Sequence, residues 1–190
     1  MRVCLLLAIP ALALAGCQSA AEKHASETGE IEASNATMKE VSGLTRAAQK
    51  KHAMQPGLWE TAMKVESSDL SMLPADQQAA QADALARQER AATRCAKASD
   101  LKTLDIEHLE KVAGQCTFPH FVQKGGKLDV EISCTQNGVT THVTQKGSMS
   151  ATGYDVVVDQ TAGTAGQPGY SAFRLHATGR RIGECAAKGA

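Results

Sequence analysis

Apolar and polar residues alternate along residues 58–66, and this alternation predicts a β-strand. Successive side chains of a strand point to opposite faces, so a strand with one buried face has an alternating sequence. The turn residues Pro56-Gly57 come directly before it. The residues expected on the buried face are Trp59, Thr61, Met63 and Val65. Trp59 is the only tryptophan, and we expect it to anchor the core rather than to stack on a ligand.

A second alternating stretch, residues 127–134, is the return arm of a predicted hairpin whose turn is Gly125-Gly126. Folding the chain at these glycines brings apolar residues together on the face that carries two cysteines. The pairs in this register are Cys116 with Cys134, Phe118 with Ile132, and Val122 with Leu128. Proline has no backbone N–H to donate, so Pro119 predicts that the first arm lies at a sheet edge or carries a bulge.

Three more strands are predicted in the second half of the chain, at residues 139–148, 153–159 and 170–178. The dipeptide Asn137-Gly138, before the first of them, is a strong hairpin turn. The residues expected on their inner face are Val139, Thr141, Val143, Tyr154, Val156, Val158, Phe173 and Leu175. Strands joined by short turns pair antiparallel, so we expect a mostly antiparallel meander of about six strands.

Two stretches have helical spacing. Residues 75–91 follow Pro74, a residue that favours a helix start, and their apolar stripe is narrow. That stripe consists of Ala75, Ala79, Ala82, Leu85 and Ala86. A second helix is expected after Ser99-Asp100 and before Gly114, with Leu101, Leu104, His108, Leu109 and Val112 on one side. One or two helices packed on an antiparallel sheet predict the α+β class.

Charge and aromatic content narrow the possible partners. The 190 residues carry 20 basic and 20 acidic side chains, a net charge of zero. Proteins that bind nucleic acid need a basic surface, so no nucleic-acid partner is expected. One Trp, two Tyr and three Phe predict a modest core, which usually needs covalent support.

The N-terminus has the layout of a secretory signal peptide. Arg2 precedes an almost wholly apolar run, Val3 to Leu14, that is too short to span a membrane. Leu14-Ala15-Gly16-Cys17 resembles the lipobox of bacterial lipoproteins. This resemblance implies cleavage before Cys17 and attachment of fatty acyl chains such as palmitate to that residue. Gln18, where an Asp typically causes inner-membrane retention, implies the outer membrane, with the protein facing the periplasm. The alternative is a secreted protein cut nearby, in which Cys17 is incidental.

The segment after this cysteine has the composition of a linker. Residues 18–54 contain no aromatic residue and are rich in Ala, Ser, Glu, Lys and Thr. We therefore divide the chain into a signal peptide (1–16), a lipidated cysteine with a flexible tether (17–54) and a folded domain (55–190). The alternative is a partner-binding helix. It rests on the helical spacing of Met38, Val41, Leu44 and Ala48, with Ser34 or Asn35 as the cap.

Four cysteines are left for the folded domain. An even number in an oxidising compartment predicts two disulfides. The hairpin register favours Cys116–Cys134, and elimination then pairs Cys95 with Cys185. A zinc site is the alternative, but no C-x-x-C spacing and no paired histidines accompany these cysteines, so no metal is expected.

The chain carries no familiar catalytic motif: G-x-S-x-G, P-loop, dinucleotide fingerprint and H-E-x-x-H are all missing. We therefore predict no catalytic residue, no cofactor and no enzymatic activity. Asp155 and Asp159 share one face of a strand, as carboxylates on a solvated face do. His120, His142 and His176 lie on predicted strands and would form a weak metal site if those strands were neighbours. Strand parity places His120 on the inner face and His142 on the outer, so scattered histidines are the preferred interpretation.

Several of these features recur together in one family. They are Pro56-Gly57-Leu58-Trp59-Glu60, a cysteine after a helical insert, a hairpin with a cysteine on each arm, and Arg181-Ile182-Gly183-Glu184-Cys185. In these features the chain resembles a group of proteobacterial exported proteins catalogued as domain of unknown function 3617, over residues 54–186. The resemblance implies export, disulfides and a mostly antiparallel β domain. It supplies no activity and no site residues.

These observations favour a non-enzymatic binding or interaction module of the cell envelope, at the periplasmic face of the outer membrane. Its partners would be the membrane, through acyl chains on Cys17, and an envelope protein. The alternative is a carrier or sensor of a lipid or another small apolar ligand, held between sheet and helix. A metal-binding protein and an unrecognised hydrolase are less favoured.

Overall fold

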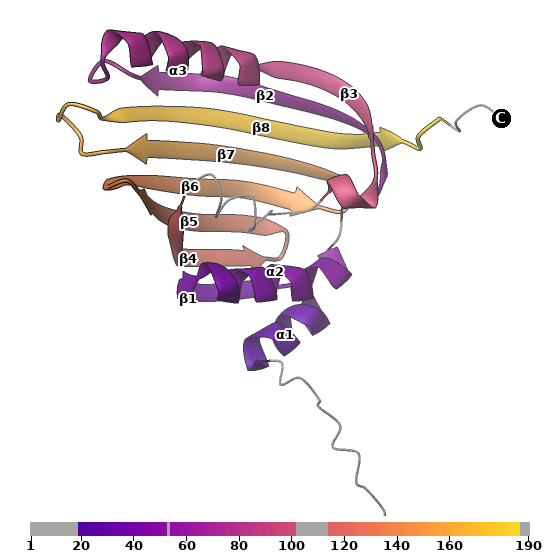
Figure 1. Ribbon diagram of the computed structural model, residues 1–190. Coiled ribbons are helices and arrows are strands. Elements are labelled where there is room, and N and C mark those ends of the chain that lie inside the picture. Colours follow the sequence, from indigo (N-terminus) through magenta and orange to yellow (C-terminus); the bar gives the residue numbers. More distant parts are fainter. Residues whose placement is uncertain (1–18, 53, 102–113, 187–190) are drawn as a thin grey trace, which may run out of the picture.

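The computed structural model describes residues 19–52, 54–101 and 114–186. Eight strands form one antiparallel sheet in the order β1-β4-β5-β6-β7-β8-β2-β3 (Figure 1). The strands are β1 (Ile31–Thr37), β2 (Gly57–Asp69), β3 (Arg90–Ala96), β4 (Gln115–Lys124), β5 (Lys127–Gln136), β6 (Val139–Ser150), β7 (Gly153–Ala162) and β8 (Ser171–Gly183). The helices are α1 (Ala20–Thr28), α2 (Met38–His52) and α3 (Ala75–Gln88), with a 3-10 turn at Ala98–Asp100. The α+β class is confirmed.

The alternating patterns located six of these strands, β2 and β4 to β8. Strands β4 to β8 follow one another as a meander, and β2 then pairs with β8 on the far side. The sheet has two strands more than expected, because β1 adds to one edge and β3 to the other. In β3 only Ala96 is buried, so this strand has no alternating apolar pattern for sequence reasoning to detect.

The expectation of a flexible tether over 17–54 is wrong for residues 19–52. They fold as α1, β1 and α2, and they supply part of the core. The buried apolar residues from this segment are Ala25, Ile31, Ala36, Val41, Leu44, Ala47 and Ala48. Most of these are alanines, which fit where a helix packs closely on a sheet but leave the composition looking like that of a linker. The folded unit therefore begins well before residue 55.

The helix predicted as an alternative to a tether forms as α2, and Val41, Leu44 and Ala48 are buried at the predicted spacing. Its N-terminus is capped by Thr37 rather than by Ser34 or Asn35, which lie within β1. The Glu40 N–H donates to Thr37 Oγ1 at 3.3 Å, and the Thr37 N–H donates to the Glu40 carboxylate at 2.8 Å. This reciprocal pair is a capping box, which satisfies two N–H groups that the first turn leaves free.

The β4–β5 hairpin has the predicted turn, but its register changes partway along. Cys116 faces Cys134 as expected, whereas a bulge between Thr117 and His120 contains Pro119. Beyond the bulge the pairing is shifted by one residue, so the expected pairing of Val122 with Leu128 is wrong, and Gln123 faces Leu128 instead. Pro119 thus marks the bulge and not a sheet edge, since β1 pairs with the other side of β4.

Two disulfides link the strands in the predicted pairing. One joins Cys116 to Cys134 directly across β4 and β5. The other joins Cys95 in β3 to Cys185, which follows β8, across a sequence separation of 90 residues. The loop-entropy model assigns a cross-link of this span on the order of 4 kcal/mol of stabilisation. It attaches the edge strand β3 to the end of the domain.

The helices leave the sheet unevenly covered. Helices α1 and α2 lie at the β1 end, and α3 lies beside β2 at the other end (Figure 1). In α3 only Leu85 is buried, in keeping with a weakly packed helix, and the helix ends at Gln88 rather than at residue 91. Residues 102–113, which hold most of the second predicted helix and His108, lie outside the described residues.

The packing of α2 on the sheet predicts the effect of truncating one side chain. Val41 is 0% exposed, so we expect Val41→Ala to lower the free energy of unfolding by about 2 kcal/mol, measured by urea unfolding. Val139→Ala makes the same chemical change at a residue that is 49% exposed. We expect this control to stay within about 0.5 kcal/mol of the wild type. Equal stability of the two variants would show that α2 does not belong to the cooperative unit.

Candidate functional site

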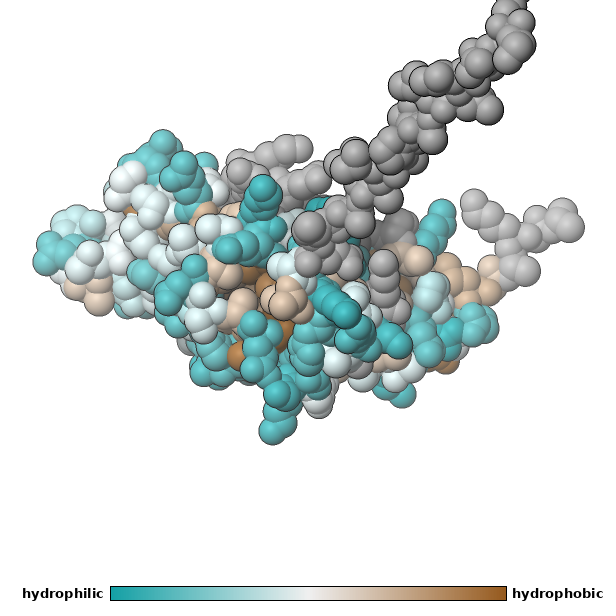
Figure 2. Space-filling view, turned by 90° about the horizontal axis from the view of Figure 1, so that it is seen from below, coloured by the Kyte–Doolittle hydropathy of each residue, from teal (hydrophilic) through white to brown (hydrophobic). Residues whose placement is uncertain are grey.

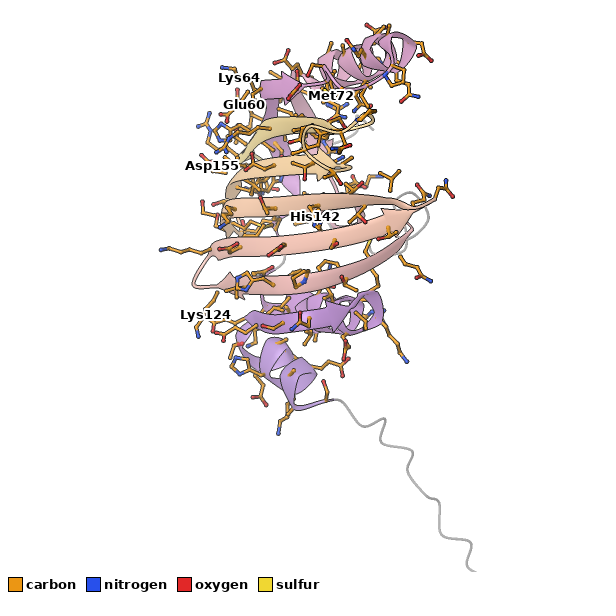
Figure 3. All side chains as sticks on the ribbon, turned by 90° about the vertical axis from the view of Figure 1, so that its left-hand side faces the viewer. Glu60, Lys64, Met72, Lys124, His142 and Asp155 are labelled. Carbon is orange, nitrogen blue, oxygen red and sulfur yellow. A yellow bond between two sulfur atoms is a disulfide. The ribbon has the colours of Figure 1, made fainter. Side chains whose placement is uncertain are left out.

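The two faces of the sheet differ in chemistry. We call the face that carries the core side chains the inner face and the opposite one the outer face. One inner row, across β5, β6, β7, β8 and β2, is Leu128, Gly147, Val156, Ala177 and Met63. The adjacent outer row is Asp129, Lys146, Val157, His176 and Lys64. Figure 3 shows the outer-face residues Glu60, Lys64 and Asp155 projecting from one side of the sheet.

Ion pairs join many charges of the outer face. Arg174 Nε lies 2.9 Å from Glu66 Oε2, and its Nη1 lies 3.1 Å from Asp159 Oδ1. A hydrogen bond of 2.8 Å joins His176 Nε2 to Asp155 Oδ1 on the same face. Because these side chains are partly exposed, each pair contributes at most about 1 kcal/mol. Asp155 and Asp159 thus share a solvated face, as predicted.

The three strand histidines do not meet. His120, His142 and His176 lie on β4, β6 and β8, so another strand separates each from the next. Strands are about 4.8 Å apart, which puts alternate strands roughly 10 Å apart, too far for one metal ion. The expected inner position of His120 is wrong, because the bulge at Pro119 reverses the parity of the rest of β4. His142 lies on the outer face, as predicted.

The inner face has a hollow of about 280 Å³. We call it the inner hollow. Its lining comes from six strands, from the segment before β2 and from the segment after β3. It consists of Met54, Trp59, Thr61, Arg94, Ala96, Asp100, Leu101, Leu128, Gln145, Met149, Tyr154, Val156, Val158 and Ala177. Leu128 and Val156 also belong to the core cluster that includes α2, so the hollow borders the core. Most of the lining residues are apolar.

Two stacked aromatic rings form one wall of the inner hollow. The ring centres of Trp59 and Tyr154 are 6.4 Å apart, with 23° between their planes. Trp59 is 1% exposed, in the core position expected of it, and its Nε1–H donates to the Gln55 carbonyl at 2.9 Å. A Cβ atom at Gly179 would lie 2.2 Å from the Tyr154 ring, so only glycine lets that ring pack against β8. The wall is therefore fixed by packing and by a hydrogen bond.

A few polar groups accompany this apolar surface. Arg94, on β3, pairs with Trp59 across the β2–β3 ladder. Burial raises the pKa of the Tyr154 hydroxyl above its ordinary value, and the positive charge of Arg94 opposes that shift more weakly. The Asp100 carboxylate accepts a hydrogen bond from the Lys97 N–H at 3.0 Å. The hollow thus combines an apolar floor with a cationic side chain and a phenol hydroxyl.

A larger hollow of about 650 Å³ lies between the helical layer and the start of β4. Its lining includes the polar or charged residues Glu22, Lys39, Ser42, Arg46 and Thr117. Figure 2 views the molecule from the end where α1 and α2 lie and shows mostly hydrophilic surface around small apolar patches. Glu22, Lys39 and Arg46 thus give this second hollow three charged side chains, whereas Arg94 and Asp100 are the two in the lining of the inner hollow.

Cys17, the predicted lipidation site, lies outside the described residues. Within the described ranges, no group of three or more His, Cys, Asp or Glu is placed to hold a metal ion. No helix in the same ranges is long and apolar enough to cross a membrane.

Sequence reasoning located some of the lining and missed the rest. The alternating patterns put Trp59, Tyr154, Val156 and Val158 on the inner face, but they do not reveal where that face stays open. Arg94 was missed because residues 90–96 lack an alternating pattern. The pairing of β3 with β2, which brings Arg94 beside Trp59, joins residues 27 to 39 positions apart in the chain.

Comparison with known proteins gives one match. The model of a family described as "Protein of unknown function (DUF3617)" matches residues 54–185. No curated protein and no solved structure matches the chain. Every residue that lines the inner hollow lies within the matched range, whereas α1, β1 and α2 precede it.

The raised pKa of Tyr154 predicts a loss of stability at alkaline pH. Burial disfavours the phenolate, so the hydroxyl binds its proton more tightly in the folded than in the unfolded chain. Above about pH 10 the unfolded chain loses this proton first, and the free energy of unfolding falls as the pH rises. We expect Tyr154→Phe to remove part of this fall, measured by urea unfolding at increasing pH. The same alkaline slope in both proteins would contradict the prediction.

Proposed function

The chain belongs to the DUF3617 family of proteins of unknown function, and we propose that it is a non-enzymatic binding module whose inner hollow takes a small apolar ligand. The observation that carries this proposal is the open apolar hollow beside a fixed aromatic wall. Small-molecule sites are typically concave and mostly apolar, with few polar groups that orient the ligand. The inner hollow has each of these properties.

The volume of the hollow limits the size of the ligand. An apolar cavity of about 150 Å³ is enough to bind benzene, and drug-sized pockets begin near 300 Å³. At about 280 Å³ the inner hollow fits a single acyl chain segment or one ring system. A whole two-chain phospholipid would exceed it, so the ligand we propose is a small or single-chain molecule.

The chemistry of the lining supports binding rather than catalysis. Of the described residues that line the hollow, none is His, Cys or Lys, and its hydroxyl groups belong to Thr61 and Tyr154. A hydroxyl nucleophile needs a neighbouring base for activation. The carboxylate in the lining, Asp100, accepts a backbone hydrogen bond at the 3-10 turn.

We also propose that acylated Cys17 holds the domain at the periplasmic face of the outer membrane. The support is the sequence Leu14-Ala15-Gly16-Cys17, together with the early start of the fold. Ser19 caps α1, which begins at Ala20, so only two peptide steps, about 7 Å, separate Cys17 from folded structure. An anchor this short would hold α1 directly against the lipid surface, whereas a long tether would let the domain move away from it.

Native mass spectrometry of the chain from Gln18 onward tests the ligand. This form keeps every described residue. After expression in the periplasm, we expect a discrete extra mass of lipid size that accompanies the folded protein and is lost on denaturation. A clean mass, combined with no uptake of added single-chain lipid, would overturn the small-ligand proposal and favour a protein partner.

Filling the hollow tests whether the ligand sits there. Ala177 lines it and faces Val156 across β8 and β7, so we expect Ala177→Phe to abolish the bound mass while the fold persists. Ala62→Phe makes the same change on the outer face, at an exposed position of β2, and should leave binding intact. Near-ultraviolet circular dichroism checks the fold of both variants. Unchanged binding in Ala177→Phe would place the ligand elsewhere.

A further inference from the structure

Arg94 places a positive charge at the rim of the inner hollow, and among the described residues this charge forms no ion pair. Arg94 lines the hollow from the edge strand β3, next to the buried ring of Trp59, and its side chain is exposed. A guanidinium at a solvated rim keeps its hydration while its stem lies along apolar surface. Arg94 therefore lies where an apolar floor meets water.

Arginines of β8 have protein carboxylates as partners. Arg174 pairs with Glu66 and Asp159, and Arg180 pairs with Glu60. Arg94 forms no ion pair with a carboxylate among the described residues. Arg94 is thus a donor available to a ligand.

A second polar group lines the same hollow. Tyr154 stacks on Trp59, the residue that Arg94 faces across the β2–β3 ladder, so its ring is fixed in place. A guanidinium and a phenol hydroxyl in the lining of one hollow provide several hydrogen-bond donors for one anionic group.

We propose that the ligand is a single-chain amphiphile with an anionic head, which binds with its head at Arg94 and its chain along the apolar floor. The floor residues are Leu128, Met149, Val156, Val158 and Ala177. Charge complementarity at the rim and apolar burial in the floor select this class of molecule together. The inference rests on the proposed function, because it names the ligand class of the same hollow.

Two sources would supply this chemistry, a fatty acid with a carboxylate head and a single-chain lipid with a phosphate head. Trp59 is the only tryptophan and lies in the wall, so its fluorescence reports binding without a label. We would titrate the chain from Gln18 onward with dodecanoate, dodecyl phosphate and the uncharged dodecanol, all below the concentrations at which they aggregate. The first two ligands distinguish the sources, and dodecanol shares the chain without the charge.

We expect at least one anionic ligand to bind roughly tenfold more tightly than dodecanol. Arg94→Gln should bring the affinity for that ligand down to the level for dodecanol and leave dodecanol binding unchanged. Arg94→Lys keeps the charge and should keep most of the preference. Arg90→Gln is the matched control, because Arg90 lies on the same strand and face but outside the lining, and it should keep the full preference.

Each outcome separates this inference from the proposed function. Equal affinity for charged and uncharged ligands, or a preference that survives Arg94→Gln, would overturn the inference and leave the apolar site in place. Binding of neither kind of ligand would overturn the proposed function as well.

Discussion

The burial of α2 against the first strands of the sheet is the contact on which the rest of this structure depends. An antiparallel sheet can leave one face in water, but its apolar face needs a cover. Val41 and Leu44 of α2 provide that cover. They belong to the same buried cluster as Phe118 and Phe121 of β4, whose ring centres lie 5.9 Å apart. Phe118 and Phe121 are three positions apart, and in a regular strand they would point to opposite faces. The one-residue shift at the Pro119 bulge lets both point inward. The inner hollow lies at the border of this core.

The open part of the inner face is shaped by close approaches of the backbone as well as by side chains. Gly147 and Gly179 lie in inner rows, where a Cβ atom would collide with the β7 backbone or with the Tyr154 ring. Each glycine removes a side chain from the face that carries the hollow and lets its neighbour pack tightly. The outer face has a different character, because many of its charged side chains pair with one another in water. A binding function is therefore better supported on the inner face.

The Cys95–Cys185 disulfide connects the covalent framework to the candidate site. Strand β3 is an edge strand with few buried residues, and such a strand gains little from packing. The disulfide fixes it at Cys95, the residue directly after Arg94. A rim residue on a loose strand would bind an anionic head poorly, since each binding event would first have to order that strand. The cross-link thus supports both the fold and the position of the proposed head-group site.

The sequence by itself determined the features that follow from local patterns. Alternation located six strands, the glycine turn and the facing cysteines located the β4–β5 hairpin, and cysteine counting gave the second disulfide. Local patterns failed where contacts distant in sequence decided the outcome. The alanine-rich residues of α1 and α2 have a linker-like composition, and only their packing on the sheet makes them part of the core. Strand β3 and Arg94 depend on pairing with β2, and the face of His120 depends on a bulge that changes its parity. The inner hollow is lined by residues of six strands and lies away from the end of the sheet that α2 covers, and no local stretch of sequence encodes that geometry.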